Sequence, residues 1–159
     1  MIEEPPSITG EAPQESDCRK LALKYLSKRE YSRHELSLKL RRKGCTSRDC
    51  ETVLARLCAE HLLSDQRYAE IYLQSKVRRG YGPTRIRMNL EESGVPRDVI
   101  DAAFEQIEIE WSDQLKLQHV KKFGHTEPAS YKEWVKRARY LNNRGFSSDL
   151  IHNVLEFTG

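Results

Sequence analysis

Apolar residues recur along this chain at the three- and four-residue spacing of amphipathic helices, and no segment sustains the period of two expected of a strand. The pattern returns around three glycines, Gly44, Gly94 and Gly145, which lie 50 and 51 residues apart. Each glycine follows a leucine by four positions, and apolar residues follow the glycine at offsets of 1, 6, 9 and 10. These followers are Cys45, Cys50, Val53 and Leu54, then Val95, Ile100, Ala103 and Phe104, then Phe146, Ile151, Val154 and Leu155.

A glycine in this setting is typical of the position just past the end of a helix, where it adopts a left-handed conformation without a steric penalty. The apolar residues after it then line one face of a second helix. A further amphipathic segment precedes each such pair, at residues 18–30, 65–79 and 111–123. The pattern predicts an all-α protein of three tandem three-helix repeats. We expect an elongated, curved array, because each repeat is too small for a large core of its own.

Helix-start signals support this division. Residues 32–35 (Ser-Arg-His-Glu) and 130–133 (Ser-Tyr-Lys-Glu) have the sequence of a capping box. At the equivalent place in the second repeat stands Gly82-Pro83, which suits an N-cap followed by the first helical residue. The glycines of the segment KVRRGYGPTRIR therefore indicate a turn between two helices.

The composition indicates a boundary near residue 17 and a net positive charge for the residues that follow it. Five of the 24 acidic residues, but none of the 27 Lys and Arg, lie in residues 1–17, which leaves residues 18–159 with a net charge of +8. Residues 1–17 also hold three prolines, so we expect a disordered acidic tail there. The repeats are then expected at residues 18–63, 64–109 and 110–159. No apolar run is long enough for a membrane span and no leader is recognisable, so a cytoplasmic protein is expected, and we expect it to be a monomer.

Four cysteines are present, and none forms a CxxC pair. In a cytosolic chain they are expected to stay reduced. A zinc site from Cys45, Cys50, Cys58 and His61 has no standard ligand spacing, so burial in the core is the better interpretation.

No constellation typical of an enzyme is present. The chain lacks a complete dinucleotide or P-loop fingerprint, HExxH and GxSxG, and its five histidines are scattered. The sequence therefore predicts a protein without catalytic residues, cofactor or metal.

Two basic clusters stand out instead. Cations in the last turn of a helix complement its dipole, but Arg85 and Arg87 fall near the start of a predicted helix, where the dipole disfavours them. Charge kept there suggests a surface that binds a partner or DNA. The residues of this predicted patch are Lys39, Arg41, Arg42 and Lys43 in the first cluster, and Lys76, Arg78, Arg79, Tyr81, Arg85 and Arg87 in the second.

Two runs, ALKYLSKREYSRHELSLKLRRKG and LLSDQRYAEIYLQSKVRRGYGPTRIRMNLEESGV, resemble the RecX family of bacterial recombination regulators. The second run is the more specific, and the likeness extends over about residues 18–159. The resemblance implies three tandem three-helix repeats and a non-enzymatic protein. It also implies binding in the groove of the RecA filament on single-stranded DNA. Inhibition of RecA ATPase, strand exchange and coprotease activity would then modulate recombination, DNA repair and the SOS response.

Two other functions remain open from the residues alone. A direct, weak and non-specific DNA-binding module fits the basic charge. Sequence-specific reading by the third helix of each repeat is disfavoured, because that helix carries many carboxylates. A nuclease is the remaining class, and the lack of a convergent Asp/Glu/His set argues against it.

Overall fold

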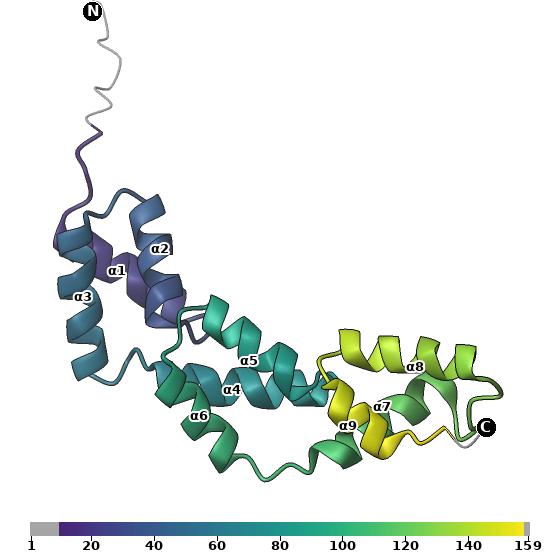
Figure 1. The fold of residues 1–159 in the computed structure, drawn as a ribbon. Helices are drawn as coiled ribbons and strands as arrows, with labels where there is room; N and C mark the ends of the chain where they lie inside the picture. Colours follow the sequence, from purple (N-terminus) through teal and green to yellow (C-terminus); the bar gives the residue numbers. More distant parts are fainter. Residues whose placement is uncertain (1–9, 158–159) are drawn as a thin grey trace, which may run out of the picture. The chain divides into compact units, whose positions relative to one another are not determined.

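The computed structural model describes residues 10–157, and within this range the chain forms nine α-helices and no strand (Figure 1). The helices follow one another in three sets of three, which confirms the all-α class and the tandem three-helix repeats. The predicted curvature of the array stays a prediction. The bounds are α1 Glu15–Leu26, α2 Arg33–Arg42 and α3 Ser47–Ala59; α4 Asp65–Arg78, α5 Pro83–Glu92 and α6 Arg97–Gln106; α7 Trp111–Phe123, α8 Tyr131–Asn143 and α9 Ser148–Val154.

The chain divides into two compact units, residues 1–64 and 65–159. The first unit holds one repeat, in which α1, α2 and α3 pack on one another around Leu36, Leu40 and Leu57. The second unit holds the other two repeats. Ile86, Leu90 and Ile100 lie in the core of one, and Leu115, Leu141 and Phe146 lie in the core of the other. No helix among the described residues combines the length and the apolar character needed to cross a membrane.

The repeated glycines occupy the positions that the sequence predicts. Gly44, Gly94 and Gly145 have φ angles of 95°, 75° and 103°, in the left-handed region. In all three repeats the N–H of the next residue donates to the carbonyl of the leucine four positions before the glycine, over 3.1 Å. This is the hydrogen bond of a Schellman motif, which turns the chain back so that the residue after the glycine packs on the core.

The capping boxes are confirmed in one case and modified in the other. Ser32 accepts a hydrogen bond from the Glu35 N–H at 3.1 Å, and the Glu35 carboxylate accepts one from the Ser32 N–H at 3.3 Å. Ser130 likewise accepts from the Glu133 N–H at 3.2 Å. The Glu133 carboxylate, however, accepts from the N–H of Ala129 at 2.9 Å, one residue before the N-cap.

The first helix begins earlier than predicted. α1 starts at Glu15, inside the segment 1–17 that was expected to be a disordered tail. Its start is held by the Asp17 carboxylate, which accepts from the Gln14 N–H at 3.1 Å, and by an ion pair of 2.7 Å between Glu15 and Arg56. Acids in this first turn also favour the helix dipole, so their charge supports a helix here and is no sign of a tail. Residues 10–14 precede the helix without regular secondary structure, and residues 1–9 of the predicted tail lie outside the described residues.

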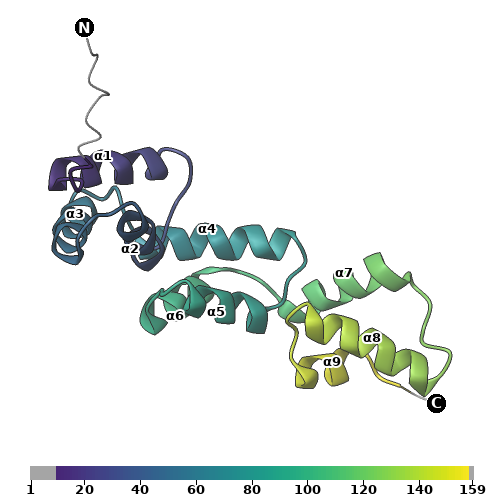
Figure 2. The same ribbon diagram turned by 90° about the horizontal axis from the view of Figure 1, so that it is seen from above.

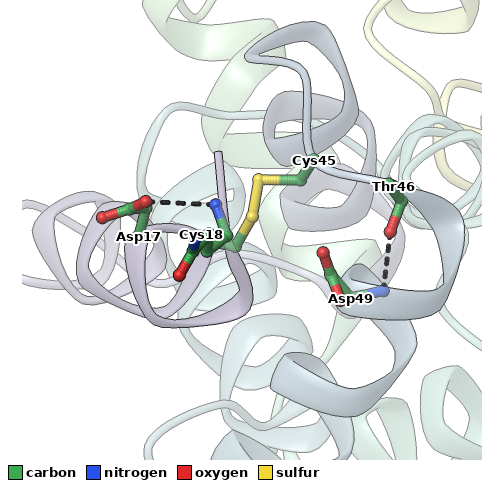
Figure 3. The surroundings of a disulfide bond; sticks show 6 residues. Asp17, Cys18, Cys45, Thr46 and Asp49 are labelled. Atoms are coloured by element: carbon green, nitrogen blue, oxygen red, sulfur yellow. Dashed lines mark hydrogen bonds between the residues drawn. A yellow bond between two sulfur atoms is a disulfide. The ribbon is translucent and has the colours of Figure 1, made fainter. Parts of the chain in front are cut away.

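The expectation that all cysteines are reduced is wrong for two of them. Cys18 of α1 and Cys45 of the α2–α3 turn form a disulfide, with their Cα atoms 6.1 Å apart (Figure 3). The Schellman motif turns Cys45 inward, toward the face of α1 that carries Cys18, and both residues are buried. Cys45 is thereby removed from the zinc-ligand set considered above. Cys50 and Cys58 are free, and burial raises the pKa of the Cys50 thiol, which makes it less reactive.

The third repeat contains a buried arginine with a dense set of partners. Arg137 of α8 donates to the Glu133 carboxylate at 2.6 Å, to the Thr126 carbonyl at 2.6 Å, and to His119 Nε2 at 3.2 Å. Because the guanidinium donates, Nε2 of His119 acts as the acceptor and carries no proton. Burial lowers the pKa of His119 below its ordinary value of 6.5, and the neighbouring Arg137 charge lowers it further.

We expect the third repeat to lose stability as the pH falls from about 6.5 down through the folded-state pKa of His119. In that window the unfolded chain binds a proton more readily than the folded one. The Glu133 pKa is also lowered from 4.5, mainly by its hydrogen bond to Arg137, so its contribution is lost only at more acidic pH. The free energy of unfolding, measured by urea titration between pH 7.5 and 5, checks this. A His119→Gln variant keeps an acceptor, and its stability should depend less on pH; equal slopes for the two proteins would contradict the assignment.

Candidate interaction surface

The first predicted cluster lies at the C-terminal end of α2. Lys39 makes cation–π contacts within its own repeat, because its Nζ lies 4.9 Å from the ring centre of Tyr25 and 5.4 Å from that of Tyr31. Arg41, Arg42 and Lys43 are exposed, and the described part of the chain offers them no ion pair. They occupy the last turn and the C-cap, where positive charge is favoured by the helix dipole.

The second predicted cluster surrounds the turn between α4 and α5. Gly80 has a φ of 84°, and the following N–H, from Tyr81, donates to the Lys76 carbonyl at 3.0 Å. Gly82 is the N-cap of α5 and Pro83 its first residue. The predicted turn is therefore confirmed, and the glycines serve helix termination and initiation.

Tyr81 is the centre of this cluster. Three cations lie against its ring: Lys76 with Nζ 4.9 Å from the ring centre, Arg85 with Cζ at 4.8 Å and Arg144 with Cζ at 4.2 Å. Arg144, which follows α8, had not been assigned to the patch. The ring gathers positive charge through cation–π attraction and holds it within one small surface.

Arg85 and Arg87 have intramolecular partners that the sequence did not reveal. Arg85 donates to the Asn143 carbonyl at 2.9 Å. Arg87 pairs with Asp101 of α6 at 2.6 Å and lies over the ring of Phe104 at 4.7 Å. These contacts supply a structural reason for cations near the start of α5, which the helix dipole alone would disfavour.

Arg78 and Arg79 are the most accessible cations of the turn. Both side chains are exposed, and neither guanidinium has a hydrogen bond or ion pair to another residue in the range 10–157. The Arg79 carbonyl, in contrast, accepts a hydrogen bond from Arg144. The backbone of this segment is thus fixed while its two guanidinium groups remain available to a partner.

The same turn joins the second repeat to the third through main-chain groups. The Gly82 N–H donates to the Arg144 carbonyl at 2.7 Å, and the Thr84 N–H donates to the Gly145 carbonyl at 3.0 Å. The α8–α9 turn accordingly lies beside the α4–α5 turn in both views (Figures 1 and 2). A glycine on each side permits this close approach. The one sequence signal was the glycine at position 82, where the first repeat has Ser32.

A third basic surface, which the sequence reasoning missed, lies along α8. Lys132, Lys136 and Arg139 are exposed and have no ion pair within the described residues. They escaped notice because other residues separate them in the sequence, whereas a spacing of four and three brings them to one face of a helix. Tyr131, at the start of the same helix, is 64% exposed.

Comparison with known proteins identifies the relationship. Models of the first, second and third three-helix domains of RecX match residues 18–57, 64–103 and 108–155.

Whole-chain likeness agrees with the domain matches. The chain is 40% identical to "Regulatory protein RecX" of Pseudomonas fluorescens strain Pf-5 over 89% of its length and 91% of that protein. It is 42% identical to the protein of the same name from Pseudomonas tolaasii, over 86% of this chain and 88% of that one. A crystal structure of RecX from Lactobacillus salivarius shares the fold, with a TM-score of 0.74 and 24% identity over 89% of this chain and 94% of the other. The chain therefore belongs to the RecX family of regulatory proteins.

Proposed function

We propose that this protein is a non-enzymatic regulator of RecA, which binds the RecA filament on single-stranded DNA and inhibits its ATPase, strand-exchange and coprotease activities. The observation that carries the proposal is the family match, because it extends over all three repeats and nearly the whole length of the curated relatives. Such a regulator would modulate recombination, DNA repair and the SOS response.

The exposed cations support a partner of opposite charge. Arg78 and Arg79 lie on a backbone fixed by the joint to the third repeat, so little conformational freedom of the turn is lost when a partner binds. Arg41, Arg42 and Lys43 offer a second contact on another repeat. Linked contacts of modest strength reinforce one another, because the first contact raises the effective concentration of the second.

The test is RecA activity on single-stranded DNA, with this protein added at substoichiometric ratios. ATP hydrolysis, strand exchange and cleavage of a RecA-dependent substrate protein are followed in parallel. Inhibition of all three is the expected result. Unchanged RecA activity at every ratio would refute the proposal, and metal-dependent degradation of the DNA by the protein alone would indicate a nuclease instead.

The double substitution Arg78→Glu/Arg79→Glu is expected to weaken inhibition of RecA on the order of tenfold. Each exposed ion pair contributes up to about 1 kcal/mol, and reversal of both charges adds repulsion. The protein concentration that gives half-maximal inhibition of the ATPase measures the effect.

Lys20→Glu/Lys24→Glu is the matched control, because it makes the same change of charge at two exposed cations of another helix, α1. It should inhibit as the parent protein does. Equal loss in both variants would show that net charge matters and the position on the surface does not.

A further inference from the structure

The start of α8 presents an exposed aromatic ring that rests against two other rings. Tyr131 stacks on Trp134 with ring centres 6.0 Å apart and planes within 9°, and it meets Phe157 edge to face with ring centres 5.9 Å apart, yet it remains 64% exposed. Trp134 is buried, and its Nε1–H donates to the Leu155 carbonyl at 2.7 Å. His152 lies against the indole at 5.0 Å. The exposed tyrosine ring therefore stacks on an indole whose orientation is fixed by burial and by its hydrogen bond to Leu155.

Two shallow hollows are lined in part by this ring. One, of about 760 Å³, runs along α8 and is lined by Tyr131, Val135, Lys136 and Arg139 among others. The other, of about 450 Å³, is bounded by Trp134 and Phe157. Tyr131 contributes to both hollows, so a flat group could lie against its ring without displacing the chain.

Positive charge follows the first hollow. Lys132, Lys136 and Arg139 are exposed along this helix, and their charges are not matched by an ion pair among the described residues. Glu133 also lines the first hollow, but its carboxylate is occupied by Arg137 and by the Ala129 N–H. The first hollow therefore has three exposed cations against one paired carboxylate, whereas Glu156 lines the second hollow, so a polyanion is favoured on the side of Lys136.

We propose that α8 binds single-stranded nucleic acid, with an unpaired base stacked on Tyr131 and the adjoining phosphates along Lys132, Lys136 and Arg139. Aromatic side chains set in a basic groove are the means by which proteins bind single strands without sequence preference. A duplex does not suit the site, because its bases already stack on one another. The cations alone would equally suit an acidic protein, but a flat, supported ring beside them favours a base.

The site is tested with the full chain and no RecA, by fluorescence anisotropy of labelled oligo(dT) and of an oligonucleotide of equal length built from abasic units. The parent protein should bind oligo(dT) more tightly than the abasic strand. Tyr131→Ala should bind oligo(dT) at least about fivefold more weakly, since one base–aromatic stack contributes about 1–3 kcal/mol. Its affinity for the abasic strand should not change. Tyr131→Phe keeps the ring and should retain the parent affinity.

The triple variant Lys132→Ala/Lys136→Ala/Arg139→Ala tests the phosphate contacts. It should reduce the slope of log affinity against log salt by about 2, because each neutralised phosphate on a single strand contributes about 0.7. Leu117→Ala, an exposed apolar residue of α7, is the control for loss of surface area. Thermal unfolding followed by circular dichroism establishes that each variant is folded.

Two results would overturn the proposal. One is oligo(dT) binding by folded Tyr131→Ala that equals that of the parent. The other is a variant set that binds DNA normally but no longer inhibits RecA, which would make α8 a surface for protein. Because the DNA assay contains no RecA, failure of this site and failure of the proposed regulatory role are distinguishable.

Discussion

Reduction of the Cys18–Cys45 disulfide is expected to lower the free energy of unfolding of the first unit by about 3 to 4 kcal/mol. The disulfide closes a loop with a sequence separation of 27, and the chain entropy removed from the unfolded state by a loop of this length corresponds to that magnitude. Hydrogen exchange followed by mass spectrometry can resolve the units. Peptides from α1 to α3 should exchange faster after reduction, while peptides from residues 65–157 should not change.

A Cys18→Ala/Cys45→Ala variant supplies the control, since its exchange should be the same with and without reductant. Thiol titration in denaturant gives an independent check: two free thiols before reduction and four after it, because Cys50 and Cys58 are free. Four thiols in the protein purified without reductant would contradict the disulfide. Equal exchange of oxidised and reduced protein would contradict its contribution to stability.

Gly82→Ala is expected to destabilise the second unit by about 2 kcal/mol. The backbone of Gly82 has a φ of −88°, which alanine adopts freely, so no conformational strain enters. An added Cβ would instead meet the main chain of the α8–α9 turn, with the Phe146 nitrogen at 2.6 Å. Backbone cannot rotate away as a side chain can, so the second and third repeats must separate. Urea unfolding followed by tryptophan fluorescence reports this directly, because Trp111 and Trp134 both lie in the second unit.

Gly145→Ala and Gly44→Ala form a matched pair for the other side of the joint. Both glycines end a helix in the same Schellman turn, with φ angles of 103° and 95°, so both substitutions carry the left-handed penalty of about 1 kcal/mol. At Gly145 a Cβ also meets the main chain of the joint, the Arg85 nitrogen at 2.9 Å, whereas at Gly44 it meets only the Pro13 side chain, at 3.3 Å. Gly145→Ala should therefore lower the free energy of unfolding more than Gly44→Ala. Equal losses would mean that the joint accommodates the added Cβ at no cost.

Most of the fold could be predicted because its signals are local. The leucine–glycine spacing predicts a local hydrogen bond in all three repeats. Its donor is the N–H of the residue after Gly44, Gly94 or Gly145, and its acceptor is the carbonyl of the leucine five residues before that donor. Ser32 and Glu35 encode a cap within a single turn of chain. Local rules of this kind do not depend on tertiary structure.

The rest required contacts between distant residues. Nothing in the spacing of Cys18 and Cys45 reveals that a turn brings them together, and compartment-based reasoning predicted the opposite. Arg85 and Arg87 looked like free charges because Asn143 and Asp101 lie 58 and 14 residues further along the chain. The cations of α8 were missed for a different reason, because a search for contiguous basic runs does not find residues grouped by helical periodicity.

The joint between the second and third repeats has a consequence for how this surface can diverge. Its backbone hydrogen bonds link main-chain atoms of Gly82, Thr84, Arg144 and Gly145, and its side-chain contacts come from Tyr81, Arg85 and Arg144. The side chains of Arg78 and Arg79 take no part in these contacts, so both positions can accumulate substitutions without loosening the attachment, provided that residues 82 and 145 stay small and residues 81, 85 and 144 are kept. Descendants of one ancestral protein could in this way acquire new binding preferences at the turn while inheriting the same scaffold.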